Sequence, residues 1–439
     1  MNICMFTNTY LPHVGGVARS VHFFAEDLRR QGNRVLVVAP TFPEKVGEPV
    51  ENDDNVLRVP ALQNFNGSDF SVRIPIPFFI DEEIDAFQPD VVHSHHPFLL
   101  GDAAIRAAYR RNLPLVFTHH TLYEEYTHYV SADSDMMRQL AINLSTEFAN
   151  LCTSVVAPSD SIAKLIAKRG VHQPITVIPT GVDIDYFGSG DGPKFRKDNG
   201  LADDALIIGH LGRLAPEKNL DYLCRAVIKA MDDTSEQLRF LVVGSGSSEK
   251  EIQRLFTEAG RQDQLFMAGE KKGQELVDAY AAMDLFVFSS KSETQGMVLV
   301  EAMAAGLPVV ALDASGAREV VRDDVNGSLL DGDATPRDFA ATILDIFADR
   351  EKREDLRHGA RETANEFSRK TTAEKMAGLY VSLQQNLHGT TEEDTITLDP
   401  LDELIHSLKI EWDLLSGKAN ALLTSLQHDK KETSSKDTP

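Results

Sequence analysis

Short apolar runs alternate with stretches of helical periodicity along most of the chain. Runs with strand character cover residues 2–7 and 34–39, parts of 89–98 and 115–120, and residues 155–157, 206–211, 240–243, 265–269, 285–288 and 325–330. Stretches with helical character cover residues 17–31, 136–152, 161–169, 220–231 and 297–305, and much of 337–385. Strands that alternate with helices form parallel sheets with helices on both faces. The pattern restarts near residue 206, so we predict an α/β protein with two doubly wound, Rossmann-like domains.

A glycine-rich, weakly hydrophobic stretch at residues 188–200 has the composition of a linker. It separates a predicted first domain at residues 1–185 from a predicted second domain at residues 200–365. Residues 388–439 follow as a tail with eleven Asp or Glu against five Lys or Arg. The apolar positions of this tail keep helical spacing, so we expect a helical extension that packs on the body or on a partner chain. We expect its end, residues 429–439, to be disordered.

Composition and charge narrow the classes of partner. The chain has 439 residues and a formal net charge of −23, which argues against nucleic acid and against a broad basic face for anionic lipid. Contact with a membrane through one local patch stays open. No apolar run approaches the ~18 residues that span a bilayer, and the N-terminus lacks the basic region of a signal peptide. The three cysteines are isolated, which is typical of a cytoplasmic protein without disulfides or zinc.

Two glutamates border the loop and the helix that follow the strand at residues 285–288. Glu293 lies in the loop and Glu301 about two turns further on, and Gly306-Leu307-Pro308 ends the helix. Carboxylates accept hydrogen bonds from sugar hydroxyls, whereas a helix N-terminus attracts phosphate. Most glutamates at this spacing are simply solvated. The combination of the Thr294-Gln295-Gly296 loop with the helix stop favours a site for a nucleotide-sugar here.

Two cations follow the first strand of the second half. Arg213 and Lys218 lie in the loop after residues 206–211. A lone Arg or Lys in a loop is usually solvated. A pair at the carboxyl end of a parallel strand can neutralise a departing diphosphate.

Glycines and histidines follow strands of the first half. Gly15 and Gly16 precede the first helix, where backbone N–H groups can approach an anion. His95, His119, His120 and His128 follow two later strands and are expected at one rim of the sheet. Their spacing is not that of a zinc site, so we predict no metal. We expect imidazoles at such a rim to hydrogen-bond a sugar or to orient an acceptor.

The segment from Ser289 to Ala311 resembles the E-x7-E motif of retaining glycosyltransferases of family 4. Residues 212–219 match the family's G-R-x-x-x-E-K-N, and residues 118–121 match its T-x-H-T. The segments Ser-Glu-Thr-Gln-Gly at 292–296 and Tyr-Glu-Glu-Tyr at 123–126 are similar to those of bacterial enzymes that glucosylate diacylglycerol. The resemblance implies the GT-B fold, in which two Rossmann-like domains face each other across a cleft. It also implies a helix near residues 368–385 that returns to the first domain.

The resemblance implies a metal-independent, cofactor-free hexosyltransferase that uses a UDP-sugar as co-substrate. The implied donor-binding residues are Gly15, Gly16, Arg213, Lys218, Glu293, Thr294, Gln295, Gly296, Met297 and Glu301. The implied catalytic residues are His120, Arg213, Lys218 and Glu293, and the implied acceptor-binding residues are Tyr126 and His128. Within this set, Glu301 would hold the ribose and Arg213 and Lys218 the leaving diphosphate. The expected reaction moves glucose from UDP-glucose to 1,2-diacylglycerol and forms an α-glycosyl lipid, with the protein peripheral on the inner face of the plasma membrane.

Three other functions stay open at this point: a transferase for a small soluble acceptor, a UDP-sugar epimerase of the GT-B fold, and a non-catalytic nucleotide-sugar sensor. Side-chain identity does not distinguish UDP-glucose from UDP-glucuronate, UDP-galactose or GDP-mannose. The oligomeric state and the role of the acidic tail are also left open.

Overall fold

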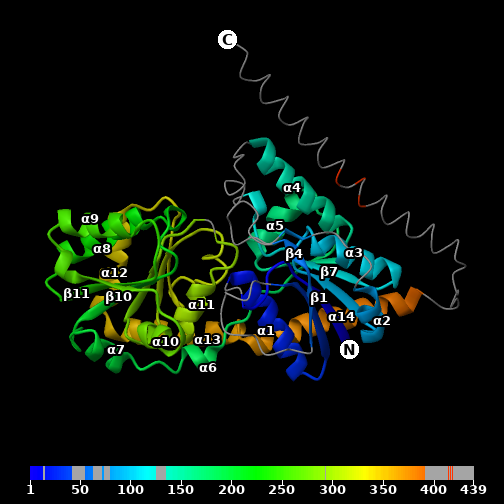
Figure 1. Ribbon diagram of the computed structural model, residues 1–439. Helices are drawn as coiled ribbons and strands as arrows, with labels where there is room; N and C mark the ends of the chain where they lie inside the picture. Colours follow the sequence, from blue (N-terminus) through cyan, green and yellow to red (C-terminus); the bar gives the residue numbers. More distant parts are fainter. Residues whose placement is uncertain are drawn as a thin grey trace, which may run out of the picture. The chain divides into compact units, whose positions relative to one another are not determined.

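A computed structural model describes residues 1–12, 15–41, 55–62, 72–73, 80–124, 135–291 and 293–390, together with residues 414, 416 and 418. The chain divides into two compact units (Figure 1). The first unit contains residues 1–179 and 372–439, and the second contains residues 180–371. Each unit has its own parallel sheet and its own core. The fold class is therefore the predicted α/β arrangement of two Rossmann-like domains.

The first unit is built on a seven-stranded parallel sheet, counted over the described residues. Its strands are β1 (Asn2–Phe6), β2 (Arg34–Pro40), β3 (Val56–Val59), β6 (Val91–Ser94), β7 (Leu115–Thr118), β8 (Ser154–Ala157) and β9 (Ile175–Val177). Their order in the sheet is β3-β2-β1-β6-β7-β8-β9. The chain thus builds outward from β1 on one side and from β6 on the other. A short antiparallel pair, β4 (Ala61–Leu62) and β5 (Val72–Arg73), lies outside this sheet.

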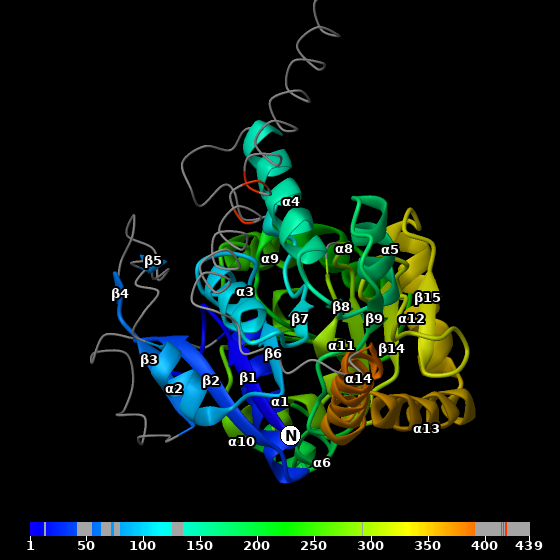
Figure 2. The same cartoon turned by 90° about the vertical axis from the view of Figure 1, so that its right-hand side faces the viewer.

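Helices cover both faces of this first sheet. They are α1 (Gly16–Arg30), α2 (Asp81–Phe87), α3 (Leu100–Arg110), α4 (Asp135–Asn150), α5 (Asp160–Lys168) and α14 (Arg369–Thr390). Successive side chains of a strand point to opposite faces. Ile3 and Met5 accordingly pack against α1 and α14, whereas Cys4 and Phe6 pack in the cluster with α3, α4 and α5. Figure 2 shows α1, α3 and α14 beside the strands of this sheet. The helix predicted near residues 368–385 is α14, and its Tyr380 is fully buried in this unit's core.

The second unit is built on a six-stranded parallel sheet, counted in the same way. Its strands are β10 (Leu206–Leu211), β11 (Leu238–Val243), β12 (Leu265–Gly269), β13 (Leu285–Phe288), β14 (Val309–Leu312) and β15 (Gly327–Leu330), in the order β12-β11-β10-β13-β14-β15. The strands β10, β11, β13 and β14 consist mainly of buried residues, most of them apolar, because helices cover both faces, whereas the edge strand β12 is half-buried.

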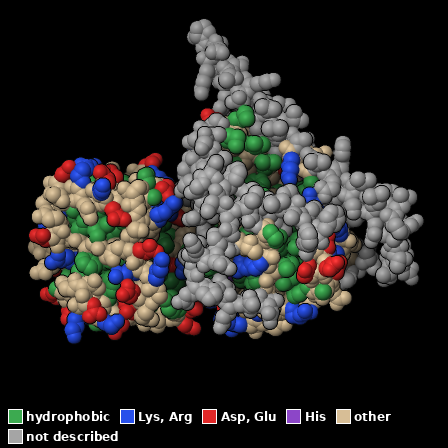
Figure 3. All heavy atoms as spheres, in the orientation of Figure 1, with side chains coloured by type: hydrophobic (Ala, Val, Ile, Leu, Met, Phe, Trp, Pro, Cys, Tyr) green, Lys and Arg blue, Asp and Glu red, His purple; other side chains and the backbone are tan. Residues whose placement is uncertain are grey.

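The helices of the second unit form two groups, one for each face of the sheet (Figure 1). They are α6 (Ile184–Phe187), α7 (Gly192–Asp198), α8 (Leu220–Asp232), α9 (Glu249–Glu258), α10 (Gly273–Ala281), α11 (Met297–Ala304), α12 (Pro336–Ala348) and α13 (Arg350–Glu366), with short 3-10 turns η3 (Pro216–Lys218) and η4 (Gln262–Gln264). One core joins the sheet to α6, α7, α10, α11 and α13, and the other joins it to α8, α9, α12 and Leu356 of α13. On the face shown in Figure 3, acidic and basic side chains of this unit are interspersed.

The prediction of a linker at residues 188–200 is wrong. This stretch contains α7, and Phe195 is buried in the core of the second unit. A Cβ on Gly190 would lie 2.4 Å from the Val277 carbonyl oxygen, and one on Gly192 would lie 2.2 Å from that of Ala281. These glycines therefore serve close packing against α10 rather than chain flexibility. The second unit accordingly begins at Thr180, before the predicted boundary.

Part of the acidic tail contacts the first unit. Leu414 is 4% exposed and belongs to the same apolar cluster as Phe148 of α4, and Lys418 donates to Asp102 of α3 across 2.6 Å. The tail therefore packs on the body of the protein at these positions. Residues 429–439 lie outside the described part of the chain. Among the described residues, no helix has both the length and the apolar character needed to cross a bilayer.

Candidate functional site

The second sheet changes direction between β10 and β13. The chain moves from β10 to β11 and β12 on one side, then starts again at β13 and moves to β14 and β15 on the other. In open parallel sheets, ligands bind outside the carboxyl ends of the strands at such a switch point. The two loops there are residues 212–219 after β10 and residues 289–296 after β13. They contain the predicted Arg213, Lys218 and Glu293.

Side-chain hydrogen bonds hold these two loops together. The Ser289 hydroxyl contacts the carbonyl oxygens of Lys218 and Asn219 at 3.1 and 3.0 Å. The Asn219 amide donates to the Ser289 carbonyl oxygen at 3.3 Å, and the Ser290 hydroxyl contacts the Glu217 carbonyl oxygen at the same distance. The loops that carry the candidate charges therefore form one connected rim.

Lys218 and Glu293 form an ion pair across the rim. They are 75 residues apart in the sequence, and their side chains are 20% and 21% exposed. An ammonium group has three donors, so Lys218 can contact a ligand anion while it holds Glu293. Arg213 lies in the same loop as Lys218 and is paired with Glu217. Its side chain is 55% exposed, which leaves it accessible to a ligand.

The N-terminus of α11 completes this rim. Gly296 is its N-cap and has a left-handed conformation, with φ of 71°. A Cβ at this position would also lie 2.7 Å from the Gly316 carbonyl oxygen, so the turn requires glycine. Thr294 and Met297 are half-buried on either side of it. The first backbone N–H groups of a helix have no partner within the helix, and they favour anions. The structure thus places Glu293, Thr294, Gly296 and Met297 in one turn.

The side chain of Gln295 has a different role from the side chains of its neighbours. Its Oε1 accepts from the Thr180 N–H at 2.7 Å, and its Nε2 donates to the Thr180 carbonyl oxygen at 2.7 Å. Both residues are buried, at 4% and 5% exposed. Gln295 therefore ties the loop after β13 to the first residue of the second unit. Its side-chain amide is engaged in these two hydrogen bonds, so its part in donor binding stays a prediction that concerns the backbone.

Replacing Gln295 by alanine should destabilise the second unit. The change leaves the buried N–H and carbonyl groups of Thr180 without these partners, which costs about 2 kcal/mol. We expect a lower midpoint in urea unfolding and a smaller loss of activity than at Lys218. Thr180→Ser is the comparison variant, because it keeps both backbone groups and loses only one buried methyl group, so its midpoint should fall less. An unchanged midpoint for Gln295→Ala would show that the two hydrogen bonds contribute nothing.

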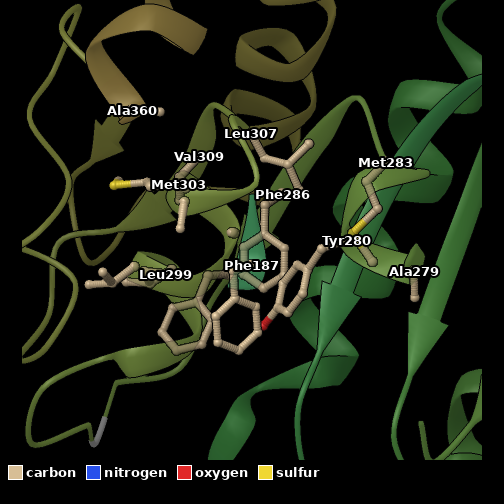
Figure 4. Close-up of a cluster of buried hydrophobic side chains, with 14 of the residues drawn as sticks. Phe187, Ala279, Tyr280, Met283, Phe286, Leu299, Met303, Leu307, Val309 and Ala360 are labelled. Atoms are coloured by element: carbon tan, nitrogen blue, oxygen red, sulfur yellow. The ribbon is translucent and has the colours of Figure 1, made fainter. Parts of the chain in front are cut away.

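Glu301 lies on α11, and its carboxylate accepts a hydrogen bond from a tyrosine. The Tyr280 hydroxyl of α10 donates to Glu301 Oε2 at 2.8 Å, and Glu301 is 7% exposed. Tyr280 is itself fully buried beside Phe187 and Phe286 (Figure 4). This packing fixes the hydroxyl, so one carboxylate oxygen of Glu301 is anchored in a set direction. Sequence reasoning missed Tyr280, because its spacing within α10 is that of an ordinary core residue.

His210 is a second residue that sequence reasoning missed. It lies on β10, is 1% exposed, and its Nδ1 is 3.1 Å from the Val287 carbonyl oxygen. Burial lowers the pKa of His210 to about 4, so the imidazole is neutral at pH 7. The signal in the sequence that could have identified His210 is a histidine within an otherwise apolar strand.

The first sheet also changes direction, between β1 and β6. The loops there are tied together, because the Asn8 N–H donates to His96 Nδ1 at 3.1 Å and the Asn8 amide donates to the Phe98 carbonyl oxygen at 3.0 Å. Gly15 is the N-cap of α1 and Gly16 its first residue. A Cβ on Gly16 would meet no atom within 4 Å, so packing within the protein does not require this glycine. A ligand that approaches the backbone closely would be a reason for a glycine at position 16.

Several of the predicted rim histidines lie together in the first unit. His95 Nδ1 is 2.9 Å from His120 Nε2, and the two rings are stacked. His119 contacts Phe117 and Tyr123 instead. Burial lowers the pKa of His119 to about 4 and holds the pKa values of His95 and His120 well below the usual range. These imidazoles are therefore neutral hydrogen-bonding groups at pH 7. Tyr126 and His128 lie outside the described residues.

Among the described residues, no three side chains of the metal-binding types are gathered as a metal site requires. The Asp183-Ile184-Asp185 segment superficially resembles a D-x-D metal motif, but Asp183 caps α6 by accepting from the Tyr186 N–H at 3.1 Å. The expectation of a metal-independent reaction stays a prediction.

Comparison with known proteins identifies two family matches. Residues 14–186 match the family described as Glycosyltransferase Family 4, and residues 191–363 match Glycosyl transferases group 1. A GDP-mannose-dependent alpha-mannosyltransferase of Mycolicibacterium smegmatis is 31% identical over 356 residues, which cover 80% of this chain and 90% of that protein. An alpha-monoglucosyldiacylglycerol synthase of Streptococcus pneumoniae is 28% identical over 363 residues, or 79% and 78% of the two chains.

The solved structures agree on the fold. HepE of Anabaena, crystallised in complex with UDP, superposes with a TM-score of 0.68 over 87% of this chain and all of that chain, at 22% identity. WaaG, a glycosyltransferase involved in lipopolysaccharide biosynthesis, gives a TM-score of 0.63 over 86% of this chain and 99% of that chain, at 16% identity. With two doubly wound units and both family matches in place, this chain belongs to family 4 of the glycosyltransferases and has the GT-B fold.

Proposed function

We propose that this glycosyltransferase moves a hexose from a UDP-sugar, with UDP-glucose as the first choice, to 1,2-diacylglycerol with retention of configuration and without a metal. The observation that carries the proposal is the rim of the second unit, where Lys218 is paired with Glu293 beside the N-terminus of α11. A cation, a carboxylate and the N-terminus of a helix in one place match the diphosphate and the hydroxyls of a nucleotide-sugar.

Each group of the rim has a separate role in this proposal. Glu301 accepts hydrogen bonds from the ribose hydroxyls with the carboxylate that Tyr280 orients. Glu293 accepts from hydroxyls of the hexose, while the backbone from Thr294 to Met297 holds phosphate oxygens. Lys218 and Arg213 stabilise the diphosphate as it leaves. Positive charge aimed at a leaving group accelerates the reaction, because the negative charge grows in the transition state.

The proposed reaction takes place on one face of the sugar. The bond between the anomeric carbon and the diphosphate oxygen breaks, and the acceptor oxygen forms a bond to the same carbon from the same side. The acceptor proton passes to a diphosphate oxygen, so the products are an α-glycoside and UDP. His120 would hydrogen-bond the hexose as a neutral group.

Two kinds of evidence support the lipid acceptor. Alpha-monoglucosyldiacylglycerol synthases of Streptococcus pneumoniae and Acholeplasma laidlawii are 28% and 27% identical to this chain. The Tyr-Glu-Glu-Tyr segment at residues 123–126 resembles that of bacterial enzymes that glucosylate diacylglycerol. Tyr126 and His128 are the proposed acceptor contacts. A peripheral contact with the inner face of the plasma membrane follows from this acceptor. The net charge of −23 restricts that contact to a local patch rather than a broad face.

A second candidate function has its own support. GDP-mannose-dependent alpha-mannosyltransferases of Mycolicibacterium smegmatis and Mycobacterium tuberculosis are each 31% identical to this chain. A D-inositol 3-phosphate glycosyltransferase of Geodermatophilus obscurus is 32% identical over 313 residues. These relatives favour a GDP-mannose donor or a small soluble acceptor as the alternative.

A matrix of donors and acceptors tests the proposal. Purified protein is incubated with UDP-glucose, UDP-galactose, UDP-glucuronate or GDP-mannose, each with dioleoylglycerol in mixed micelles, with inositol phosphate or with no acceptor. We expect a glucolipid from UDP-glucose and dioleoylglycerol that forms equally well in EDTA, with an α-anomeric proton coupling in NMR. A mannoside, a product on inositol phosphate, or a new UDP-sugar without acceptor would replace the proposal by the corresponding alternative.

A further inference from the structure

We propose that His95 is a positioning residue for the transfer reaction, and that it holds His120 in the orientation and tautomer in which His120 donates a hydrogen bond to the hexose. The inference rests on the proposed function, because the contact between His120 and the sugar belongs to it. His95 is not among the residues that the family motif supplies, and the structure provides the reason to include it.

The contact between the two imidazoles is direct. His95 Nδ1 lies 2.9 Å from His120 Nε2, and the ring centroids are 5.2 Å apart at an interplanar angle of 27°. His95 is fully buried, whereas His120 is half-buried at the carboxyl end of β7. The buried ring therefore supports the ring that a ligand can reach.

His95 is itself held rigidly. Its backbone N–H donates to the Phe6 carbonyl oxygen at 2.9 Å, and its ring lies 4.1 Å from the ring of His93. The two nitrogens of His93 are bonded to the Tyr380 hydroxyl at 2.5 Å and the Thr118 hydroxyl at 2.7 Å. A ring fixed from several sides can orient its neighbour, because its own rotamer is set by packing.

The hydrogen-bond pattern selects the tautomers. In a bond between two neutral imidazoles, one nitrogen donates and the other accepts. His95 Nε2 is buried and has no hydrogen-bond partner among the described residues. Buried N–H groups without a partner are rarer than unpaired acceptors, so the proton of His95 belongs on Nδ1. His95 Nδ1–H then donates to His120 Nε2, and neutral His120 carries its own proton on Nδ1 as a donor.

Asparagine and leucine at position 95 separate this role from packing, because the two side chains have nearly the same shape. The Asn amide can reproduce the Nδ1–H donor, whereas Leu cannot. We expect His95→Asn to keep transfer within about 3-fold of the wild type, and His95→Leu to lower kcat by about 10-fold or more with little change in donor KM. Thermal unfolding of both variants shows whether they fold alike.

The variant His120→Ala and the double variant His95→Leu/His120→Ala complete the test. We expect the double variant to be no slower than His120→Ala alone, because His95 acts through His120. Equal losses in His95→Asn and His95→Leu would overturn the inference in favour of a packing role. A wild-type rate for His95→Leu beside a slow His120→Ala would overturn it and leave the proposed function intact. A wild-type rate for His120→Ala would remove both the inference and the proposed role of His120.

Discussion

Replacing Lys218 or Glu293 by alanine is expected to reduce glycosyl transfer by about 10³-fold or more, while the protein folds normally. Lys218 is the cation that the structure holds at the switch point of the second sheet, and its loss leaves the departing diphosphate without that charge. Glu293 is paired with the Lys218 ammonium and, in the proposed function, also accepts a hydrogen bond from the hexose. Steady-state kinetics with UDP-glucose and dioleoylglycerol measures the effect, which should fall mainly on kcat.

The second unit offers matched controls for this prediction. Arg225 and Asp221 form a comparable ion pair on the exposed side of α8, far more open to solvent at 55% and 53%. Such pairs contribute little to stability, so Arg225→Ala should keep the wild-type rate. Lys218→Arg keeps the charge with a different shape and should be intermediate. Wild-type turnover in both Lys218→Ala and Glu293→Ala would refute the assignment of the rim.

Glutamine in place of Glu301 is expected to weaken donor binding about 100-fold. The proposed contact joins a buried carboxylate to two ribose hydroxyls, and hydrogen bonds to a charged group contribute about 1.5–3 kcal/mol each. Glutamine has the same shape but loses the charge and replaces one acceptor by a donor. Calorimetric titration with UDP and with UDP-glucose should show the same loss for both ligands, because both contain the ribose.

Tyr280→Phe is the companion change for Glu301. It removes the hydroxyl that donates to Glu301 Oε2 and keeps the aromatic packing against Phe187 and Phe286. We expect about a 10-fold weaker affinity for UDP, since one carboxylate oxygen is no longer oriented. Wild-type affinity for UDP in Glu301→Gln would contradict the ribose assignment, whatever the effect on turnover.

The fold could be predicted because it depends on patterns within single segments. The alternation of apolar runs and helices predicted both parallel sheets, and the predicted strand at residues 285–288 is β13. The linker prediction failed because glycine has two uses that composition does not separate. Gly190 and Gly192 allow α7 to approach α10 closely, whereas the same composition elsewhere gives flexible chain. Only the neighbouring helix shows which use applies.

The candidate site could be predicted only as a set of residues that belong to the same rim. The sequence placed Lys218 and Glu293 in loops after two strands, and the strand order explains why those loops meet. Contacts that depend on how distant segments pack could not be predicted from the sequence. Gln295 binds the backbone of a residue 115 positions away, which no side-chain pattern reports. The contact between His95 and His120 likewise depends on β6 and β7 being neighbours with this register.

The central claim is that the nucleoside diphosphate of the donor binds where β10 and β13 end in the second unit. Hydrogen–deuterium exchange of the full chain with and without saturating UDP tests it most directly, because it reports backbone amides peptide by peptide. We predict slower exchange in peptides that contain residues 212–219 and 289–301, and a smaller change in the Glu301→Gln variant at the same UDP concentration, because that variant is expected to bind UDP more weakly. Protection confined to other segments of the wild type, with these two loops unchanged, would contradict the account.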